Sequence, residues 1–442
     1  MIRVFALMAL SFSFSGFSLE VENKGSDLEK VMDHAQDQLP RDAFHVVENK
    51  FQFLNEISLK PDCEDTFHVV DVAVLADRFS LWKKCLADVE PYYALKTNND
   101  PMIASVLAML GTGFDCASEK EIEQVLGLGV NPSKIVFANP RKPISSIHYA
   151  KRKGVDLMTF DSVEELDKLS SLYPQANLLL RIKADDSLSS SHLSEKFGAT
   201  LAEAYEILDV GFERGDQIVG VAFHVGSNCT HLESYRKAIL DAAELFRYSK
   251  KRWEKDLSLL DLGGGWPGTD DASFVKIAQT VNELIHAYFS PETRFIAEPG
   301  RYFAARTTTL AMRVIGKKNL KQANKIAYYL SNGVFGFFIS SLYYEYNTEQ
   351  ILSEGWIVKP LRCPASAPTL YPSLLWGPTC DSGDKILDGI LLPEMQTGDF
   401  VTVENLGAYS KSLETSFNGV PLSRPYYICE IPSSSAFPCL EE

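Results

Sequence analysis

Three side chains that could form a reactive site each stand at the end of a short apolar run: Lys96, His224 and Glu298. A lysine amine held away from water has a lowered pKa and can form a Schiff base with an aldehyde or carbonyl compound. A solvated or salt-bridged lysine and a hydrogen-bonded core histidine are the ordinary alternatives. These residue types indicate carbonyl chemistry if the fold brings them to one place.

Two glycine-containing segments supply the means to bind an anion. Gly263–Gly265 offers backbone N–H groups for close approach, and Glu298–Arg301 adds a guanidinium. Eight-stranded α/β barrels commonly hold a phosphate between the loops after strands seven and eight. The string Gly263–Gly268 also fits the dinucleotide pattern G-x-G-x-x-G, but Pro267 stands where the helix of that motif should begin. A phosphate site is therefore favoured over a dinucleotide site.

Pyridoxal phosphate would give these residues complementary tasks. A carboxylate at Glu298 would face the ring nitrogen and keep it protonated, which makes the ring a better sink for electrons. His224 would then cover the face of the ring, and Lys96 would bind the aldehyde.

The elements that must position these residues alternate along residues 90–300, where a short β-branched or aromatic run is followed by an amphipathic helical pattern. Eight such repeats predict a parallel sheet closed into a (β/α)8, TIM-like barrel, with its site at the carboxyl ends of the strands. Ser118 with Glu121 and Ser162 with Glu165 have the spacing of capping boxes. The runs are Tyr92–Lys96, Thr112–Cys116, Lys134–Asn139, Asp156–Asp161, Asn177–Ile182, Ile218–His224, Leu257–Leu262 and Arg294–Glu298. The polar residues at or near their ends are Lys96, Asp115, Asn139, Asp161, Arg181, His224, Gly263–Gly265 and Glu298, of which Asn139 and Asp161 serve equally well as caps.

A domain of different character follows the barrel. Residues 313–435 lose the alternation and carry aromatic-rich runs broken by Pro and Gly, which predicts an antiparallel β-sandwich. Asp65–Val72 precedes the barrel and is expected to pair with that domain. The expected division is a signal-like segment at 1–18, an extension at 19–72, the cofactor-binding barrel at 73–312 and the β domain at 313–442. The runs of the β domain are Ala327–Leu330, Ser373–Trp376, Phe400–Glu404 and Arg424–Glu430.

Composition and charge exclude several classes of protein. The 442 residues are 45% hydrophobic and 23% charged, which suits a large globular core and not a disordered or fibrous chain. A net charge of -15 repels nucleic acid and anionic lipid, so neither is expected as a partner. The eight cysteines lack CxxC pairs and the eight histidines lack HExxH, which predicts mostly free thiols and no metal site.

The first 18 residues leave the compartment open. The basic start Met1–Arg3 and the apolar run to Leu19 resemble a secretory signal, and the run is too short for a membrane span of about 20 residues. A mis-assigned start or a disordered tail is the alternative. The glycosylation pattern Asn228-Cys229-Thr230 lies beside His224, where a glycan would block the predicted site. A cytoplasmic location is therefore favoured over the secretory pathway.

Seven motifs in order along the chain carry a resemblance to a known family. The chain resembles the eukaryotic ornithine decarboxylases, which are fold-type III, pyridoxal-phosphate-dependent decarboxylases, over about residues 45–430 and with matching spacing. The motifs are Pro91–Lys96, Gly113–Ser118, Phe223–Ser227, Gly263–Gly265, Glu298–Arg301, Trp376–Asp381 and Gly407–Tyr409.

The resemblance implies a role for each matching residue. Lys96 would hold pyridoxal phosphate covalently, Glu298 would pair with the ring nitrogen, and His224 would stack on the ring. Asp115 and Arg181 match family positions near the cofactor. The residues implied to bind the phosphate are Ser227, Gly265, Gly300, Arg301 and Tyr409, with Pro299 in the same motif.

The family also implies a homodimer with shared active sites, in which Cys380 and Asp381 act on the partner's cofactor. Cys380 would protonate the carbanion left after CO2 is lost, and Asp381 would contact the distal amine of the substrate. By itself the segment Trp376–Asp384 is ambiguous, because Cys380 could be a small buried hydrophobe or a proton donor.

One departure from the family pattern bears on the substrate. Tyr343 and Tyr344 occupy the place of a family Tyr-Asp pair that contacts the substrate's far amine, so one carboxylate is missing. A charge contact of this kind is worth about 1.5–3 kcal/mol. Weaker ornithine binding, a shifted substrate, or compensation by Glu345 would follow.

Two functions from different classes are compatible with these observations. The first is decarboxylation of a basic amino acid, with L-ornithine to putrescine, a step of polyamine biosynthesis, favoured over lysine or arginine. The second is a non-catalytic relative that resembles antizyme inhibitor and binds antizyme. The retained site residues favour the enzyme.

Overall fold

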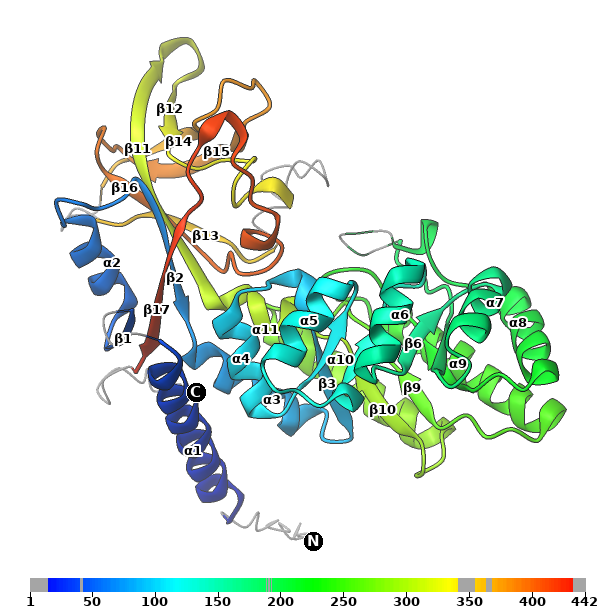
Figure 1. Cartoon of the computed structure of the whole chain (residues 1–442). Helices are drawn as coiled ribbons and strands as arrows, with labels where there is room; N and C mark the ends of the chain where they lie inside the picture. Colours follow the sequence, from blue (N-terminus) through cyan, green and yellow to red (C-terminus); the bar gives the residue numbers. More distant parts are fainter. Residues whose placement is uncertain are drawn as a thin grey trace, which may run out of the picture.

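A computed structural model describes residues 15–39, 43–187, 189, 191, 193–340, 354–362 and 368–431 of the chain. Eight parallel strands close into a barrel in the order β10-β3-β4-β5-β6-β7-β8-β9, beside a second domain built on a large sheet (Figure 1). The predicted barrel is confirmed, and each of its strands overlaps one of the eight predicted runs. The strands are β3 (Val89–Ala94), β4 (Gly113–Cys116), β5 (Ile135–Phe137), β6 (Leu157–Phe160), β7 (Asn177–Arg181), β8 (Ile218–Ala222), β9 (Leu259–Asp261) and β10 (Arg294–Ala297).

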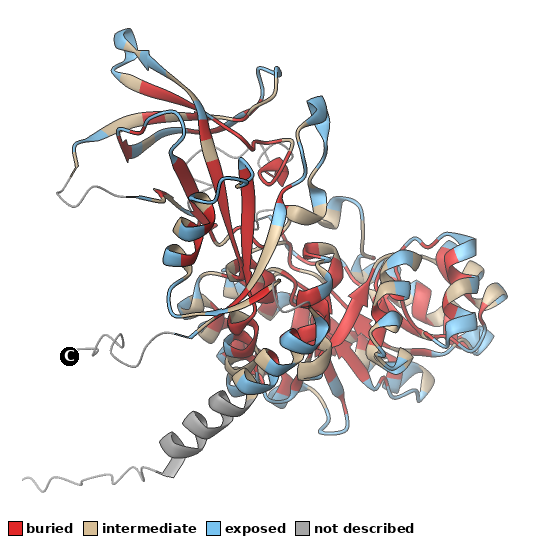
Figure 2. Cartoon of the chain, turned by 60° about the vertical axis from the view of Figure 1, so that its left-hand side comes forward, coloured by how far each residue is buried: buried red, intermediate tan, exposed pale blue. Residues whose placement is uncertain are grey.

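The barrel strands are buried on both faces, which explains why their sequences are apolar without strict alternation. One set of side chains fills the barrel interior, where Gly113 leaves room for the ring of Tyr92. The other set packs against the surrounding helices, whose outer faces are exposed (Figure 2). These helices are α3 (Ala73–Cys85), α4 (Pro101–Leu110), α5 (Glu119–Gly127), α6 (Ile144–Lys153), α7 (Val163–Leu172), α8 (Leu201–Arg214), α9 (Leu232–Trp253) and α10 (Asp271–Tyr288), with the short α11 (Arg301–Ala304) after β10.

The two predicted capping boxes form only in part. Ser118 and Ser162 each accept a hydrogen bond from the backbone N–H three residues on, so both begin their helices as expected. The return bonds differ: Glu121 accepts from the N–H of Ala117, and Glu165 forms ion pairs with the buried Lys142 and with Lys168 instead. Tertiary contacts therefore use the two glutamates in place of the local motif.

The β domain is one mixed sheet rather than a purely antiparallel one. Its central path runs β1-β17-β2-β11-β12-β14-β15, while β16 pairs with β11 and β13. Most pairs are antiparallel, but β1 with β17, β17 with β2 and β12 with β14 are parallel. The strands are β1 (Phe44–Val47), β2 (Thr66–Asp71), β11 (Thr308–Leu320), β12 (Lys325–Leu330), β13 (Ile357–Pro360), β14 (Leu370–Trp376), β15 (Lys385–Pro393), β16 (Phe400–Glu404) and β17 (Arg424–Glu430).

Strands from both ends of the chain complete this sheet. The expectation that Asp65–Val72 joins the β domain is confirmed, because β2 pairs with β11 and with the last strand, β17. Helix α2 (Lys50–Ser58) packs on the same sheet through Phe53, Leu54 and Ile57. Strand β11 therefore leads from the barrel into the β domain, where it pairs with β2 of the N-terminal segment.

The N-terminal helix α1 (Ser15–Gln38) contacts α3 and α4 and buries Val31 and Ala35 against the barrel (Figure 1). Residues 1–14 of the signal-like segment lie outside the described residues. Across the part that is described, no helix combines the length and the apolar character needed to cross a membrane. The six cysteines within it are free thiols.

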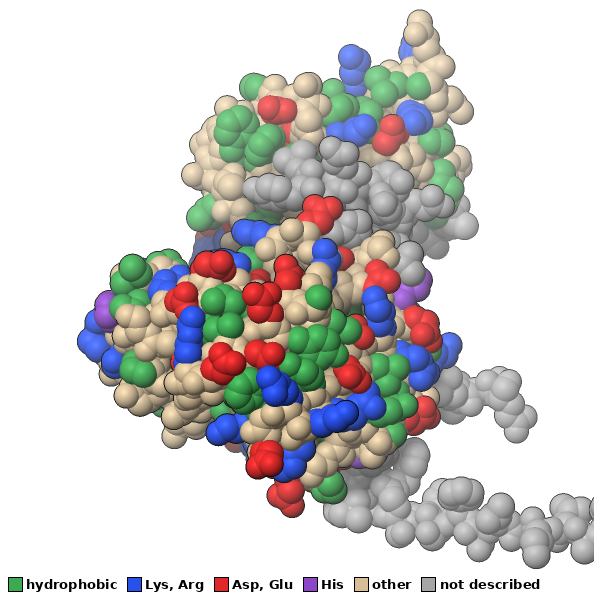
Figure 3. Space-filling model, turned by 90° about the vertical axis from the view of Figure 1, so that its right-hand side faces the viewer, with side chains coloured by type: hydrophobic (Ala, Val, Ile, Leu, Met, Phe, Trp, Pro, Cys, Tyr) green, Lys and Arg blue, Asp and Glu red, His purple; other side chains and the backbone are tan. Residues whose placement is uncertain are grey.

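Charged side chains of both signs are interspersed on the face shown in Figure 3, with apolar side chains between them. In the described ranges there is also no group of three His, Cys, Asp or Glu side chains arranged to hold a metal ion.

Candidate active site

The predicted reactive side chains lie together at the carboxyl ends of the barrel strands. Lys96 is in the turn after β3, Asp115 is in β4, and Glu298 follows β10. Because β3 pairs with β4 on one side and β10 on the other, these three residues come from neighbouring positions on the rim. The Nζ of Lys96 lies 2.7 Å from Oδ2 of Asp115, whose side chain is fully buried.

The electrostatics of Lys96 differ from the sequence-based expectation of a lowered pKa. Burial alone would lower the pKa of the amine, but the carboxylates of Asp115 and Glu298 outweigh it and raise the pKa above the ordinary lysine value. About 38% of the Lys96 side chain is reached by solvent through the barrel mouth. The amine is therefore a cation that is paired with, and positioned by, the carboxylate of Asp115.

A surplus of carboxyl groups surrounds this amine. Burial and the neighbouring charges of Asp261 and Asp115 raise the pKa of Glu298 well above its ordinary value. Burial and the charge of Asp115 raise the pKa of Asp261, at the end of β9, against a hydrogen bond from the N–H of Gly263. Arg181, at the end of β7, is the second cation of the group, and burial lowers its pKa against the opposing charges of Glu298 and the nearby aspartates.

His224 follows β8 and is uncharged at neutral pH. Burial, and then the charges of Arg181 and Lys96, lower the pKa of His224 well below its ordinary value. Its Nδ1 accepts a hydrogen bond from the N–H of Gly226 at 3.0 Å, which places the ring proton on Nε2. The ring beside Gly264 is therefore a neutral surface with one N–H donor, as stacking on a cofactor ring requires.

The residues expected to bind a phosphate also come together. Arg301 donates from Nε to Oγ of Ser227 at 3.1 Å, and its guanidinium lies 5.3 Å from the ring of Tyr409. Tyr409 has φ of 54° and is fixed by a bond from its N–H to the carbonyl of Thr97 at 2.9 Å. These contacts join loops from β3, β8 and β10 to the β domain at one point.

Glycine is required at two places in this cradle. Gly265 has φ of +109°, and a Cβ there would lie 2.6 Å from the carbonyl oxygen of Gly226. At Gly300 a Cβ would lie 2.0 Å from Oγ1 of Thr97. Pro299 is buried between Glu298 and Gly300. Close contacts between loops of the rim therefore require glycine at both positions, and binding of an anion by their backbone stays a prediction.

The donor set fits pyridoxal phosphate. An amine, a neutral imidazole and a high-pKa carboxyl lie at the barrel mouth, while a guanidinium, a serine and two close-packed glycines lie beside them. Oδ1 of Asp115 and Oγ1 of Thr97 are buried and have no hydrogen-bond partner within the described residues. Buried polar atoms are normally hydrogen-bonded, so these two are available to a bound group.

Not every predicted residue joins this cluster. Cys380 and Asp381 are exposed in the turn between β14 and β15, where the N–H of Cys380 donates to Asn418 at 3.0 Å and Asp381 accepts from Gly383 at 2.7 Å. Tyr343 and Tyr344 lie outside the described residues. The role of Cys380 and Asp381 in a partner's site stays a prediction.

Asn139 and Asp161 are not the N-caps of the helices that follow. Those N-caps are Pro143 and Ser162. Asn139 instead closes a turn, and Asp161 binds a distant loop. Asn139 accepts from the N–H of Arg141 at 3.0 Å, and Asp161 accepts from the N–H of Gly198 at 2.8 Å and pairs with Arg141. Both hold loops of the rim in place.

Two residues of the site were missed from the sequence. Asp261 had a detectable signal, because it lies within the seventh run next to the glycines. Glu354, which pairs with Arg301 at 2.6 Å, had none, since it follows a long segment without pattern.

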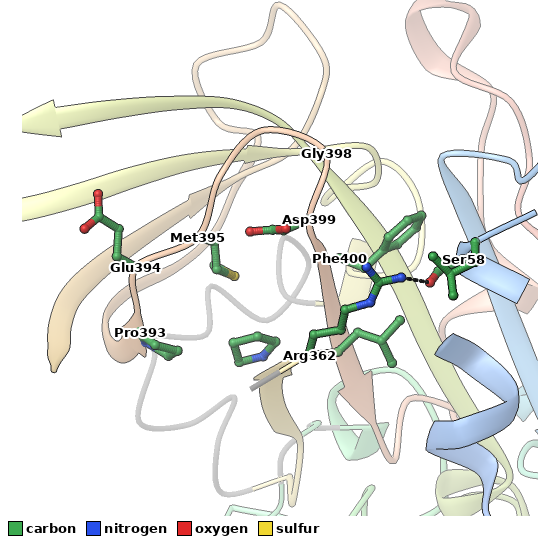
Figure 4. Close-up of a pocket in the computed structure, with 11 residues that line it drawn as sticks. Ser58, Arg362, Pro393, Glu394, Met395, Gly398, Asp399 and Phe400 are labelled. Atoms are coloured by element: carbon green, nitrogen blue, oxygen red, sulfur yellow. Dashed lines mark hydrogen bonds between the residues drawn. The ribbon is translucent and has the colours of Figure 1, made fainter. Parts of the chain in front are cut away.

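A cavity of about 360 Å³ lies elsewhere, in the β domain between the end of α2 and strands β13, β15 and β16. Figure 4 shows Arg362 at its wall, where Nη2 donates to Oγ of Ser58 at 3.2 Å. The predicted catalytic and phosphate residues are not among those that line it. Its lining is unrelated to the cluster at the barrel mouth.

The model for the pyridoxal binding domain of pyridoxal-dependent decarboxylases matches residues 72–305, which span the barrel and the cluster just described. The chain belongs to this decarboxylase family. Pyridoxal phosphate is accordingly the cofactor of the chain.

The relatives within the decarboxylase family include enzymes and a regulator. The chain is 40% identical to ornithine decarboxylase of Rattus norvegicus, over 85% of this chain and 83% of the relative. It is 39% identical to antizyme inhibitor 2 of Xenopus laevis, over 87% of each. The arginine decarboxylase of Paramecium bursaria Chlorella virus has the same fold, with a TM-score of 0.80 and 32% identity over 86% of this chain and all of the virus chain. Membership of the family therefore does not decide whether the chain is catalytic or which substrate it takes, and both questions depend on the residues of the site.

Proposed function

We propose that the chain is a working decarboxylase of a basic amino acid, with L-ornithine as substrate and putrescine as product. The observation that carries the proposal is the ion pair of Lys96 with Asp115 at 2.7 Å, flanked by the high-pKa carboxyl of Glu298. A lysine, a carboxylate that positions its amine and an acid for a ring nitrogen suit chemistry assisted by pyridoxal phosphate.

Each residue of the set has a task. When bound, pyridoxal phosphate supplies a ring that accepts the electron pair left by the departing carboxylate. Lys96 would hold the cofactor covalently, and Asp115 positions the Lys96 amine at 2.7 Å. Glu298 holds a proton against the ring nitrogen, and His224 covers the ring and keeps water from that face.

The phosphate is bound by Arg301 together with Ser227, Tyr409 and the backbone of Gly265 and Gly300. The loops after β8 and β10, which carry Ser227 and Arg301, are already joined by the hydrogen bond between these two residues. Binding of the phosphate would fix the orientation of the cofactor ring relative to the catalytic residues. Reacting groups that are held in the right orientation have a high effective concentration.

Residues of a second subunit complete the site in this proposal. Cys380 of the partner returns a proton to the reacting carbon, and Asp381 of the partner contacts the distal ammonium of the substrate. Both side chains are exposed on the β domain, as a role across an interface requires. The loss of one carboxylate at Tyr344 costs about 1.5–3 kcal/mol of ammonium binding, which predicts a higher KM for ornithine than a site with two carboxylates has.

A non-catalytic role as an antizyme-binding regulator is the second candidate, and the relative from Xenopus laevis is the observation that favours it. Against it stand the retained side chains of the cofactor site, among them Lys96, Arg181, Glu298, Arg301 and Tyr409. A chain freed from catalysis has no need to keep a buried group of three acids and two cations.

Absorption spectroscopy and CO2 release test the proposal together. The purified protein incubated with pyridoxal phosphate should absorb in the visible, and Lys96→Ala should abolish that band. Lys134→Ala is the matched control, because Lys134 makes a 2.6 Å ion pair with Glu90 at a partly exposed position. Trapped CO2 from ornithine, lysine, arginine and leucine then gives the substrate. A coloured protein that releases CO2 from none of them would refute the catalytic proposal, and a colourless one would favour the antizyme-binding role.

A further inference from the structure

Glu354 places a carboxylate on the arginine that is expected to bind the cofactor phosphate. Its Oε2 lies 2.6 Å from Nη1 of Arg301, and the two side chains are only 5% and 12% exposed. Glu354 comes from the β domain, just before β13, whereas Arg301 begins α11 at the rim of the barrel. The pair therefore links the two domains at the phosphate cradle.

The backbone around Glu354 is held on both sides. Oγ1 of Thr269, in the loop after β9, donates to the carbonyl of Glu354 at 3.0 Å. Nδ2 of Asn405, in the loop that leads to Tyr409, donates to the carbonyl of Gly355 at 2.7 Å. Gly355 has φ of +84°, and a Cβ there would lie 2.5 Å from Oγ1 of Thr269. The carboxylate is thus presented to Arg301 by a fixed turn.

Arg301 is the meeting point of two anion-binding arrangements. Its Nε donates to Ser227 and its guanidinium lies near the ring of Tyr409, which are the contacts of the phosphate site. Its Nη1 faces Glu354. A phosphate bound at Ser227 and the carboxylate of Glu354 would share one guanidinium, so two anions would repel each other across a single cation.

We propose that Glu354 is an internal competitor of the cofactor phosphate for Arg301, and that it sets the affinity of the chain for pyridoxal phosphate. The inference rests on the cofactor and not on the proposed catalytic activity. The proposal predicts that Arg301, Ser227 and Tyr409 bind the phosphate more weakly than they would without Glu354. It also predicts that the cofactor exchanges with cofactor in solution.

Cofactor titration of the full-length protein tests the proposal without any turnover. Protein stripped of cofactor is titrated with pyridoxal phosphate and, separately, with pyridoxal, which lacks the phosphate, and binding is followed by tryptophan fluorescence and visible absorbance. Glu354→Gln should lower the Kd for pyridoxal phosphate about tenfold, because removing the partly screened repulsion between the carboxylate and the phosphate is worth about that factor. The Kd for pyridoxal should stay unchanged.

Glu404→Gln is the matched control. Glu404 is another nearly buried glutamate of the β domain, and it pairs with Lys50 and Lys359 at 2.9 Å instead of with Arg301. It should destabilise the fold without changing either Kd. Glu354→Asp, which draws the carboxylate back by one methylene, should lower the Kd for pyridoxal phosphate by a smaller factor, and it serves if Glu354→Gln fails to fold.

An unchanged or raised Kd for pyridoxal phosphate in both Glu354 variants would overturn the proposal and assign Glu354 a purely supporting role. Equal changes for pyridoxal and pyridoxal phosphate would overturn it too, because they would show an effect that does not act on the phosphate. A chain that binds the cofactor but releases no CO2 would refute the proposed activity and leave this inference standing.

Discussion

Gly300→Ala should disable the cofactor site by adding a single methyl group. The glycine stands between Glu298 and Arg301, and its φ of -91° is open to any residue, so only space opposes a side chain. An added Cβ would lie 2.0 Å from Oγ1 of Thr97, 3.0 Å from Cβ of Thr97 and 3.1 Å from Cβ of Ala94. Rotating the threonine cannot relieve the last two contacts, so the backbone of one loop must move.

The size of the effect follows from which loops meet there. The segment that carries Thr97 also carries Lys96, and the segment that carries Gly300 also carries Glu298 and Arg301. Overpacking a buried site costs about 1–3 kcal/mol of folding stability. A misplacement of about 1 Å between reacting groups costs on the order of a hundredfold in rate. We therefore expect kcat/KM to fall about a hundredfold, with weaker cofactor binding, while the protein still folds.

Gly127→Ala is the control, because Gly127 lies at the end of α5 with no atom within 4 Å of an added Cβ. A second variant tests the steric cause: Thr97→Ala removes the hydroxyl that would lie 2.0 Å from the added Cβ, so it should partly rescue Gly300→Ala relative to Thr97→Ala alone. Activity and cofactor Kd are measured for all four proteins. If Gly300→Ala behaves like Gly127→Ala, the close approach of these two loops does not support the site.

Two more predictions concern the interface and the fold. Cys380→Ala should slow turnover and release an aldehyde by-product. If the subunits share active sites, mixing Cys380→Ala with Lys96→Ala should restore up to about a quarter of wild-type activity. No recovery of activity in the mixture would contradict a shared site. Burial raises the pKa of Asp71 to about 7, against hydrogen bonds from the N–H groups of Glu430 and Ala73. Because this folded-state pKa lies above the unfolded value, the stabilisation is complete below about pH 4 and is lost as the pH rises through 7. Between pH 4 and 7 the unfolding free energy of the wild type should therefore fall by up to about 4 kcal/mol more than that of Asp71→Asn. Urea-unfolding curves that are the same for the wild type and Asp71→Asn at both pH values would disprove the prediction.

Local pattern was sufficient to predict the barrel but not the order of the sheet. Each barrel strand pairs with its neighbour in sequence, so the alternation of runs already contains the topology. The β domain joins β17 to β2 across more than half of the chain, and nothing in either strand's sequence specifies that the pair is parallel. Long connections allow either direction, and the preference for antiparallel pairs that applies to hairpins is lost.

The same distinction separates the site residues that were predicted from those that were not. Lys96, His224 and Glu298 were found because strand ends in a barrel meet at one rim. The predicted direction of the pKa shift of Lys96 was wrong because the sequence indicated burial but not the carboxylate of Asp115. At 2.7 Å this carboxylate raises the pKa of Lys96 by more than burial lowers it. Glu354 could not be predicted, because its position depends on a glycine turn tied to two other loops.

The charges within the chain match the two ends of the cofactor in opposite ways. At the ring end, burial and the charges of neighbouring carboxyls raise the pKa values of Glu298 and Asp261, so a cationic ring nitrogen would relieve the repulsion among these carboxyls. At the phosphate end, the cation Arg301 is already paired with Glu354, so a phosphate must compete for it. The free energy of cofactor binding should therefore come mainly from contacts with the ring. Removing the carboxylate of Glu354 should increase the share that comes from contacts with the phosphate.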